Sequence, residues 1–531
     1  MKLIIHSTRD PVSECGYRYF KHTYGFDPES VPGTCIFSED PGIPEVNDSC
    51  KIQGWIPVSD TKIPVFRKPA DLNGMGKPLV FFTDTRVTYP CAVETGDSII
   101  LSLDCCYQMG FCLAGNLENV WRDNPDIRCD LITIPFVDYY AGIFFAVIRQ
   151  LYQRLHLPLI HPSFWPQGKS CAVCLTHDVD EVKKTYQWVT YPLKLIKQGN
   201  FGTLIPQVHS LIEKLRGHEP YWTFDEILRT EGSRGIKSSF YFLKETGKVR
   251  ISDRGTWRHM GRRYDCNDTP LRELLHDLDS RGWEVGLHGS FYSYLDPERL
   301  RLEKEALEHS LGTSVSGGRQ HNLNLKIPDT WLYQEKAGLL YDTTLGYNDC
   351  LGFRWGISFP FRPFFPEEDR DLDVLQIPLA IEDLPYFRSQ EPFDQLVKIF
   401  SNLTGVHGCL TLLWHHSVFN EHEFPGWGPG YIKILDYCAL HNAWIGSGRQ
   451  ISEWWTRRQE TVITWEYSHE RLKLVISPKE GIHFITIYPP DQLKINEVKN
   501  AGIIACGQGS YELETQSVPE NEGIEITFSM I

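Results

Sequence analysis

The sequence predicts an α/β fold with a parallel sheet or a (β/α) barrel at its centre. Strand-like and helix-like segments alternate from residue 168 to residue 459, and such alternation is typical of parallel sheets. Several helical segments begin with a start signal, such as Thr269-Pro270 or Asp296-Pro297. The apolar run 171–175 leads directly into two acids, Asp178 and Asp180, and active-site groups of such folds follow the carboxyl ends of strands.

The elements of this central region can be placed by their apolar patterns. The expected strands are 172–176, 238–243, 283–287, 339–343, 375–379 and 408–414. The expected helices include 270–280, 297–310, 328–337 and 392–403. A helical insert over 185–235, basic at its start, follows the first strand. A long insertion at this position is expected to shape the mouth of a site.

Two flanking regions differ from the centre in pattern. Residues 1–165 mix short strands (79–82 and 98–103) with a helix over 137–156, and we expect an α/β accessory domain. The prolines at 158, 162 and 166 mark its end. Residues 461–531 contain four alternating segments, 462–467, 472–476, 484–488 and 524–528. These predict a small β-sandwich-like domain, which leaves 166–460 for the barrel.

Composition restricts the function classes. A chain of 531 residues is too long to fold around a single hydrophobic core. Its net charge of −15 is spread along the sequence. This charge argues against a nucleic-acid partner and against a surface that binds anionic lipid. No window reaches the roughly 18 apolar residues of a membrane span, and the first ten residues lack a signal-like apolar run. We therefore expect a cytoplasmic protein whose 15 scattered cysteines are reduced. Cys171 and Cys174 form a CxxC inside a strand-like run and are interpreted as structural.

Two carboxylates as close as Asp178 and Asp180 repel each other unless a cation or a proton lies between them. In a metal hydrolase, one such acid holds the metal and the other takes a proton from the attacking water. Further polar residues follow other predicted strands, and a barrel brings such strand ends to one face. They are His288, Arg319 with His321, the segment 341–346, and His415 with His416.

Taken in this order, the segments resemble the polysaccharide deacetylase superfamily, the NodB-homology enzymes of carbohydrate esterase family 4. The resemblance covers 171–455 and is nearest to a branch whose first motif is Thr-His-Asp-Val-Asp. It implies a distorted (β/α)7 barrel and a divalent metal, usually zinc. It also implies hydrolysis of an N-acyl group, N-acetyl above all, on a sugar or sugar-like substrate.

The resemblance assigns roles residue by residue. Asp178 matches the catalytic base, and Arg319 matches the arginine that pairs with and orients it. Asp180 matches the metal-binding acid, displaced by one residue because Val179 intervenes. His288 matches the first metal histidine, and His415 matches the histidine that protonates the leaving amine.

One position departs from the family pattern. The second metal histidine would stand four residues after His288, where this chain has Tyr292, and tyrosine is a much poorer zinc ligand. His321 is the candidate replacement, because it follows Arg319 at the same predicted mouth. The alternative is that His321 is solvated or contacts substrate.

Substrate contacts are predicted from side chains near the mouth segments. The candidates are Trp222, Asp349, Arg354, Asp383 and Trp414. Large aromatic side chains are more often core residues, and Asp349 and Arg354 would equally suit a structural ion pair.

The sequence leaves three functions open. The first is a cytoplasmic, metal-dependent deacetylase acting on a soluble N-acylated sugar intermediate. The second is a hydrolase on the same barrel that acts on a linear, non-sugar amide. The third is a catalytically silent glycan-binding or scaffold protein, suggested by Tyr292 and the two flanking regions.

Overall fold

The structure of the protein is a computed structural model. It describes residues 2–7, 10–30, 35–38, 92–95, 98–101, 104–123, 132–197, 204–245, 250, 252, 264–477, 484–490, 492–506, 510–514 and 524–530. The expected strand 79–82 lies outside the described residues.

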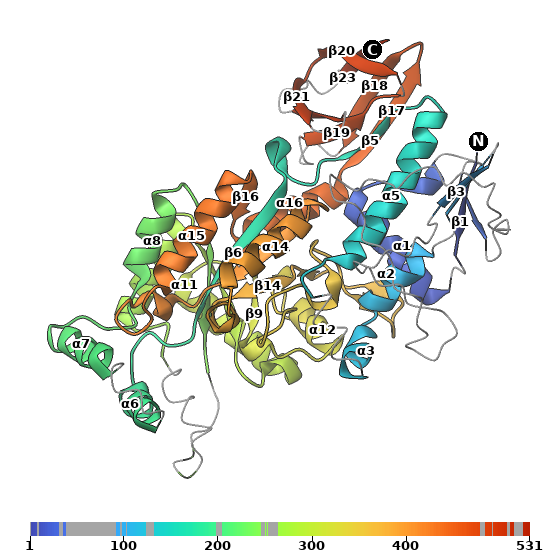
Figure 1. Ribbon diagram of the computed structural model, residues 1–531. Helices are drawn as coiled ribbons and strands as arrows, with labels where there is room; N and C mark the ends of the chain where they lie inside the picture. The colour runs from blue at the N-terminus through green and yellow to red at the C-terminus, as the bar shows by residue number, and fades with distance from the viewer. Residues whose placement is uncertain are drawn as a thin grey trace.

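The centre of the molecule is an all-parallel sheet (Figure 1). Its strands follow the order β13-β10-β9-β8-β7-β6-β15-β14, and β16 pairs with the first half of β6. The strands are β6 (Cys171–Val179), β7 (Ser239–Leu243), β8 (Glu284–Gly289), β9 (Gly317–Gln320), β10 (Tyr341–Asp342), β13 (Leu375–Gln376), β14 (Leu379–Glu382), β15 (Cys409–Leu413) and β16 (Ala443–Gly446). The prediction of a central parallel α/β sheet is confirmed.

The sheet is strongly curled. β13 and β14 stand at the two ends of the strand order, yet only Ile377 and Pro378 separate them in the chain. Ile377 donates its backbone N–H to Asp342 at 2.8 Å on one side, while Leu379 is paired with Thr411 of β15 on the other. One extended segment therefore contacts both edges of the sheet, and polar groups at the strand ends are brought close together.

Side chains alternate across β6, as the period of a strand requires. Ala172 and Cys174 belong to the cluster inside the curl, whereas Cys171, Val173 and Leu175 belong to the cluster under the covering helices. All of these are buried. The two cysteines of the CxxC thus face opposite sides of the sheet, and burial raises the pKa of both thiols to about 12.

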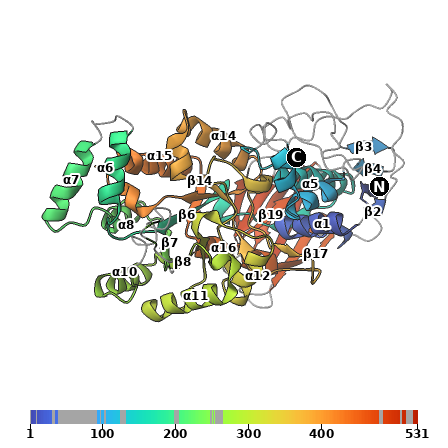
Figure 2. The ribbon, with the colours of Figure 1, turned by 90° about the horizontal axis from the view of Figure 1, so that it is seen from below.

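Helices connect the strands and cover the outside of the sheet (Figures 1 and 2). They are α8 (Phe224–Gly232), α10 (Thr269–Ser280), α11 (Pro297–Leu311), α12 (Asp329–Lys336), α13 (Asp383–Arg388), α14 (Pro392–Thr404), α15 (Trp427–Leu440) and α16 (Gly448–Glu460). The start signal at Asp296 acts as expected: its side chain accepts the Arg299 N–H, and the helix ends at Gly312, whose φ is 85°. The four expected helices are present, with ends shifted by a residue or so.

Shorter elements complete the central region. The insert predicted after β6 forms α6 (Gln187–Lys197) and α7 (Leu204–Leu215). A small hairpin joins β11 (Phe364–Phe365) to β12 (Arg370–Asp371). Short 3-10 helices occur at η1 (Pro28–Ser30), η2 (Pro166–Gly168), η5 (Ser293–Leu295), η6 (His321–Leu323), η7 (Arg354–Gly356) and η8 (His416–Phe419).

A second sheet lies near the N-terminus, in the order β2-β1-β4-β3, with β3 antiparallel to β4. Its strands are β1 (Lys2–His6), β2 (Cys35–Ser38), β3 (Ala92–Thr95) and β4 (Ser98–Leu101). The helices are α1 (Pro11–Tyr24), α2 (Cys105–Leu113), α3 (Leu117–Asp123) and α5 (Phe136–Arg154). Helix α5 confirms the helix predicted over 137–156.

The N-terminal elements share a core with the central sheet. One buried apolar cluster contains Phe144 of α5 together with Cys174, Tyr341 and Trp455. Asp138 of the same helix accepts hydrogen bonds from both the backbone and the hydroxyl of Ser358, at 2.7 and 2.6 Å. Burial raises the pKa of Asp138 to about 6. The N-terminal region is therefore packed directly on the central fold.

The C-terminal region consists of two antiparallel sheets with a core of their own. One contains β17 (Val462–Ser468), β18 (Arg471–Ser477), β23 (Ile524–Met530) and β20 (Leu493–Lys499). The other contains β21 (Gly502–Cys506), β22 (Ser510–Glu514), β19 (Phe484–Tyr488) and β5 (Leu159–Pro162). All four strands expected after residue 461 are present.

Strand β5 differs from the sequence prediction in one respect. The prolines around it predict a boundary that resists regular structure, but 159–162 pairs with β19 of the C-terminal region. β5 stands at the end of its sheet, and an edge strand tolerates proline because one side needs no N–H donor. Among the described helices, none is both long and apolar enough to cross a bilayer.

Candidate active site

The two acids at the carboxyl end of β6, Asp178 within the strand and Asp180 directly after it, lie on the inner side of the curled sheet. The side chains of Cys174 and Thr176 point inward. Asp178 and Asp180 follow at the same two-residue spacing and therefore face the same side. Asp178 is 3% exposed, whereas the side chain of Asp180 is 19% exposed. The period-two spacing therefore gives one buried and one more accessible carboxylate in the same cavity.

Arg319 holds the buried carboxylate in place. Its Nη1 donates to Oδ1 of Asp178 at 2.8 Å, its Nη2 donates to the Thr176 hydroxyl at 2.9 Å, and its Nε donates to the Thr343 carbonyl at 3.1 Å. Burial opposes the charge of the guanidinium, but the nearby Asp178 carboxylate outweighs it and leaves the pKa of Arg319 raised. Asp178 is thereby fixed with its second oxygen directed towards His288.

His288 presents one nitrogen to the two acids. Its Nδ1 lies 3.0 Å from the Arg319 carbonyl oxygen. Because a carbonyl only accepts hydrogen bonds, Nδ1 must carry the proton, which leaves the Nε2 lone pair available to a cation. That Nε2 lies 3.2 Å from Oδ1 of Asp180 and 3.6 Å from Oδ2 of Asp178.

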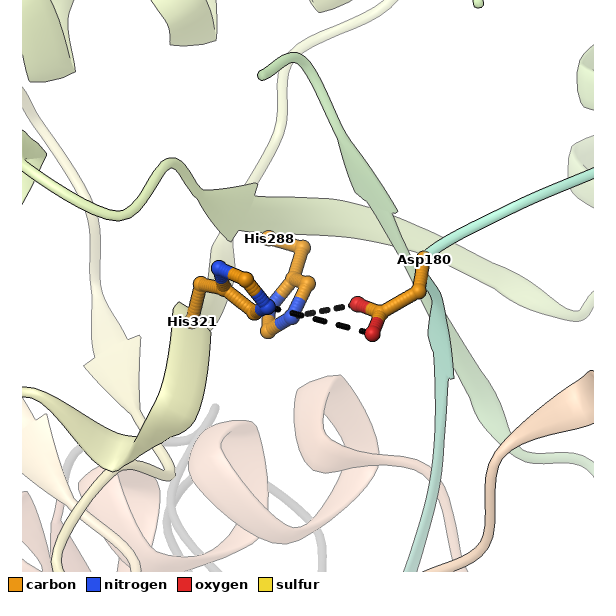
Figure 3. Close-up of side chains that lie close together, drawn as sticks. All are labelled: Asp180, His288 and His321. Carbon is orange, nitrogen blue, oxygen red and sulfur yellow. Dashed lines mark ion pairs between the residues drawn. The ribbon is translucent and has the colours of Figure 1, made fainter. Parts of the chain in front are cut away.

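His321 completes a three-residue group with Asp180 and His288 (Figure 3). Its Nε2 lies 3.8 Å from Oδ2 of Asp180, and its ring meets that of His288 edge to face at 5.3 Å. One ligand atom from each residue lies within 4.8 Å of the others. Ligands about 2.1 Å from a tetrahedral ion are themselves about 3.4 Å apart, so the observed spacing fits a divalent cation.

Tyr292 does not take part in this group. Its side chain is 48% exposed, and its ring lies under the guanidinium of Arg299 at 5.9 Å. The sequence predicts His321 as the third donor, in place of a histidine at position 292. His321 is the first residue of η6, which directly follows β9. The structure thus places His321, and not Tyr292, beside His288.

His415 lies at the end of β15 and is fixed by Asp383. Its Nδ1 lies 3.0 and 3.1 Å from the two Asp383 oxygens, and its backbone N–H donates to Oδ2 of Asp383 at 2.6 Å. Burial would lower the pKa of His415, but Asp383 outweighs it, with help from Asp180 and Asp178, and raises it to about 10. The imidazole is therefore held as a protonated acid at neutral pH.

The neighbouring His416 is structural. It is buried, its Nδ1 lies 3.2 Å from the Asp178 carbonyl oxygen, and its ring stacks on Phe224 at 4.8 Å. Burial lowers its pKa to about 4. Of the two adjacent histidines, only the side chain of His415 is partly exposed.

Two further acids beside these residues were not predicted from the sequence. Glu382 pairs with Leu413 at the end of β14 and is 8% exposed. Burial raises its pKa to about 8, and its Oε2 has no hydrogen-bond partner within the described part of the chain. Glu245 follows β7, and its Oε2 lies 3.9 Å from Nδ1 of His321. Both follow the strand-end rule that identified Asp178, so that rule could have found them.

The expected substrate-binding residues are not gathered in one place. Asp383 lies in the cavity beside His415, but Trp414 is completely buried among Tyr386, Phe387 and Tyr431. Arg354 donates to Glu118 of the N-terminal region at 2.8 Å.

The remaining two candidates lie at or near the surface. Trp222 is half-buried against Phe224. Asp349 is exposed. Neither residue belongs to the donor group of Asp180, His288 and His321.

Similarity to known proteins is low. No protein-family model and no curated protein matches the chain. Solved structures named as polysaccharide deacetylases from Mycobacterium smegmatis and Pseudomonas aeruginosa are 18% and 14% identical, cover 55% of this chain and 92% and 93% of their own, and both have TM-scores of 0.36. A CE4-family pseudoenzyme from Bacillus anthracis is 9% identical, with coverages of 54% and 66% and a TM-score of 0.28. The fold described above rests on the strand order of the central sheet.

Proposed function

We propose that the protein is a metal-dependent hydrolase that removes an N-acyl group, N-acetyl above all, from a sugar or sugar-like substrate. The observation that carries the proposal is the position of Asp178. Its carboxylate is fixed by Arg319 on one side and lies 3.6 Å from His288, a member of the three-residue donor group, on the other. An acid beside a cation site is the arrangement needed to activate a bound water.

Asp180, His288 and His321 would hold the cation. Two imidazole nitrogens and one carboxylate oxygen form a donor set that zinc accepts, with a position left for water or substrate. When bound, such an ion polarises the acyl carbonyl and lowers the pKa of water. The tautomer of His288 is fixed by a backbone carbonyl, and this orients its Nε2 before any cation arrives.

Asp178 and His415 would each carry out one of the two proton transfers. Asp178 would take the proton from the attacking water, and its hydrogen bond to Arg319 holds the carboxylate in place. His415 would donate a proton to the departing nitrogen, because Asp383 keeps the imidazole charged. Base and acid come from strands β6 and β15, which are neighbours in the sheet.

The finer features of the resemblance belong to the same proposal. We interpret the curled sheet as a NodB-type (β/α)7 barrel over 166–460, preceded by an accessory region and followed by a β-sandwich-like domain. The exposed Asp349 and the half-buried Trp222 are proposed as outer contacts for the substrate. A cytoplasmic location and a role in polysaccharide metabolism also remain proposals.

The test begins with the metal content of the purified protein. Wild type should carry about one zinc or similar ion per chain, and Asp180→Ala with His288→Ala should lose it. His309→Ala, which changes an exposed histidine of α11, is the matched control and should retain the ion. Release of acetate from N-acetylated sugars, measured beside linear amides, then separates sugar from non-sugar substrates. Bound metal without turnover of either class would favour the silent glycan-binding or scaffold function, and absence of metal after reconstitution would overturn the mechanism.

A further inference from the structure

Helix α7 is turned with its apolar side outward. Val208, Leu211, Ile212 and Leu215 recur at the spacing of one helical face, and their side chains are 55%, 47%, 38% and 80% exposed. Ser210 of the same helix is 1% exposed. A surface helix normally buries its apolar stripe and exposes its hydroxyls, so this orientation is the reverse of the usual one.

Helix α6 extends the same surface. Val189 and Leu193 lie one turn apart and are 57% and 52% exposed. The two helices contact each other and stand together at one extremity of the molecule (Figures 1 and 2). Six exposed aliphatic side chains on adjacent helices exceed the scattered apolar residues of an ordinary surface. We call these six residues the α6–α7 apolar face.

Two contacts with neighbouring segments hold α7 in this orientation. The ammonium group of Lys184 is buried between Gln207, at 2.6 Å, and Glu423. The ring of His209 stacks on His422 at 5.3 Å, with 11° between the planes. Turning α7 to bury its aliphatic side chains would break the Lys184–Gln207 hydrogen bond and the stacking of His209 on His422, whereas the ion pair of Lys184 with Glu423 lies outside α7. The exposed face is therefore built into the fold.

Charge separates this segment from the rest of the chain. No acidic residue stands between Glu181 and Glu213, whereas four lysines do, at positions 183, 184, 194 and 197. Of these, Lys183 and Lys197 are exposed. The chain as a whole carries a net charge of −15. Glu213, inside α7, is paired with Arg216 and His218. The stretch 182–212 combines exposed aliphatic side chains with lysines and contains no acid, which matches an anionic lipid surface that most of this protein would repel.

We propose that α6 and α7 dock the protein on an anionic lipid surface, with the α6–α7 apolar face buried at the level of the headgroups. Trp188 and Tyr191 are half-buried in α6, and such side chains favour the boundary between water and lipid. The proposal concerns a helix pair lying on a membrane, which needs no membrane-spanning helix. It is independent of the metal chemistry proposed for the cavity.

Docking at this face would place the cavity near the membrane. α6 begins seven residues after Asp180, at the carboxyl end of β6. The insert also packs against the segment after His415, through the contacts of Lys184 with Glu423 and of His209 with His422. The two segments that carry Asp180 and His415 are thus continuous with the elements beneath the docking face.

The test is flotation of the full-length protein with vesicles of phosphatidylcholine alone or with phosphatidylglycerol added. We expect binding to the anionic vesicles that weakens as salt is raised. Leu211→Ser with Leu215→Ser should reduce binding at least about tenfold, and Lys183→Glu with Lys197→Glu should remove the preference for anionic vesicles. Leu440→Ser with Val475→Ser, which changes residues 82% and 50% exposed elsewhere, is the matched control and should bind like wild type.

Three results would overturn the proposal. One is that wild type binds neither vesicle, and a second is that the variant with Leu211→Ser and Leu215→Ser binds as strongly as wild type. The third is a dimer of wild type, seen by sedimentation without vesicles, that this variant abolishes, because the face would then be covered by a second copy of the chain. Circular dichroism and melting temperature of each variant show that loss of binding does not reflect unfolding.

Discussion

The guanidinium of Arg319 and the carboxylate of Asp178 form a buried, directly hydrogen-bonded ion pair, with Nη1 2.8 Å from Oδ1. Both residues are almost fully buried, at 1% and 3% exposure. Neither charge has access to bulk water, so each depends on the other. The pair joins β9 to β6, which are separated in the sheet by β8 and β7.

Arg319→Met should therefore destabilise the protein and abolish hydrolysis together. Removing one partner of a buried pair leaves an uncompensated charge and costs about 3 to 5 kcal/mol of the free energy of unfolding. Denaturant unfolding measures this loss. Arg301→Met, on the exposed side of α11 where the arginine pairs with Glu298, is the control and should leave the unfolding midpoint almost unchanged. Equal effects of the two variants would contradict a special role for the Arg319–Asp178 pair.

His321 should be a metal ligand, and Tyr292 should not. We expect His321→Ala to weaken zinc binding at least about tenfold, because one of three donors is lost. Tyr292→His should leave the affinity unchanged, because position 292 is 48% exposed and outside the donor group. Competition with a chelating dye measures both affinities. Tighter zinc binding by Tyr292→His would show that the family position can still reach the ion.

Much of the central fold could be predicted from the sequence because its signals are local. Each signal lies within a few consecutive residues: the pattern of a single strand or helix, an Asp-Pro helix start, or an acid at a strand end. The strand-end rule placed Asp180, His288 and His321 at one face, where the structure brings them together; their roles as metal ligands came from the family resemblance and stay a prediction. The pairing of β5 with β19 could not be predicted, because it joins segments more than 300 residues apart that carry no mutual signal.

The substrate-contact predictions show a second limit. Trp414 is the last residue of a predicted strand and His415 follows it, but consecutive side chains along a strand point to opposite faces, and Trp414 is buried under the helices. The exposed faces of α6 and α7 are a third case, because amphipathic spacing predicts a helix without saying which side faces the protein.

Asp383→Asn should lower the pKa of His415 towards its ordinary value, because it removes the carboxylate that raises this pKa. The folded-state pKa of His415, about 10, lies above the ordinary value of about 6.5. Its pairing with Asp383 thus stabilises the fold fully below pH about 6.5, and this contribution is lost as pH rises through about 10. The free energy of unfolding of the metal-free proteins should therefore differ most between wild type and Asp383→Asn near pH 6 and converge towards pH 10. A difference that is independent of pH would contradict the assigned cause.

Glu382→Gln tests the buried acid whose Oε2 has no hydrogen-bond partner among the described residues. Here burial, and not a charged partner, is the main cause of the raised pKa. The pKa of Glu382 is raised to about 8 by burial, so the folded state keeps a proton that the unfolded chain releases above about 4.5. The free energy of unfolding of wild type should fall as pH rises from about 5 to about 8, because over this interval the unfolded state binds fewer protons than the folded state. The amide introduced by Glu382→Gln does not titrate, so the variant should gain stability relative to wild type over that interval.

Melting temperatures of the metal-free proteins at pH 5 and pH 8 measure the change. Glu305→Gln, on the outer side of α11 where the carboxylate is exposed, controls for the loss of a charge. A constant difference between wild type and Glu382→Gln would mean that the carboxyl is already ionised in the fold, and therefore that it has a cationic or hydrogen-bonding partner in solution.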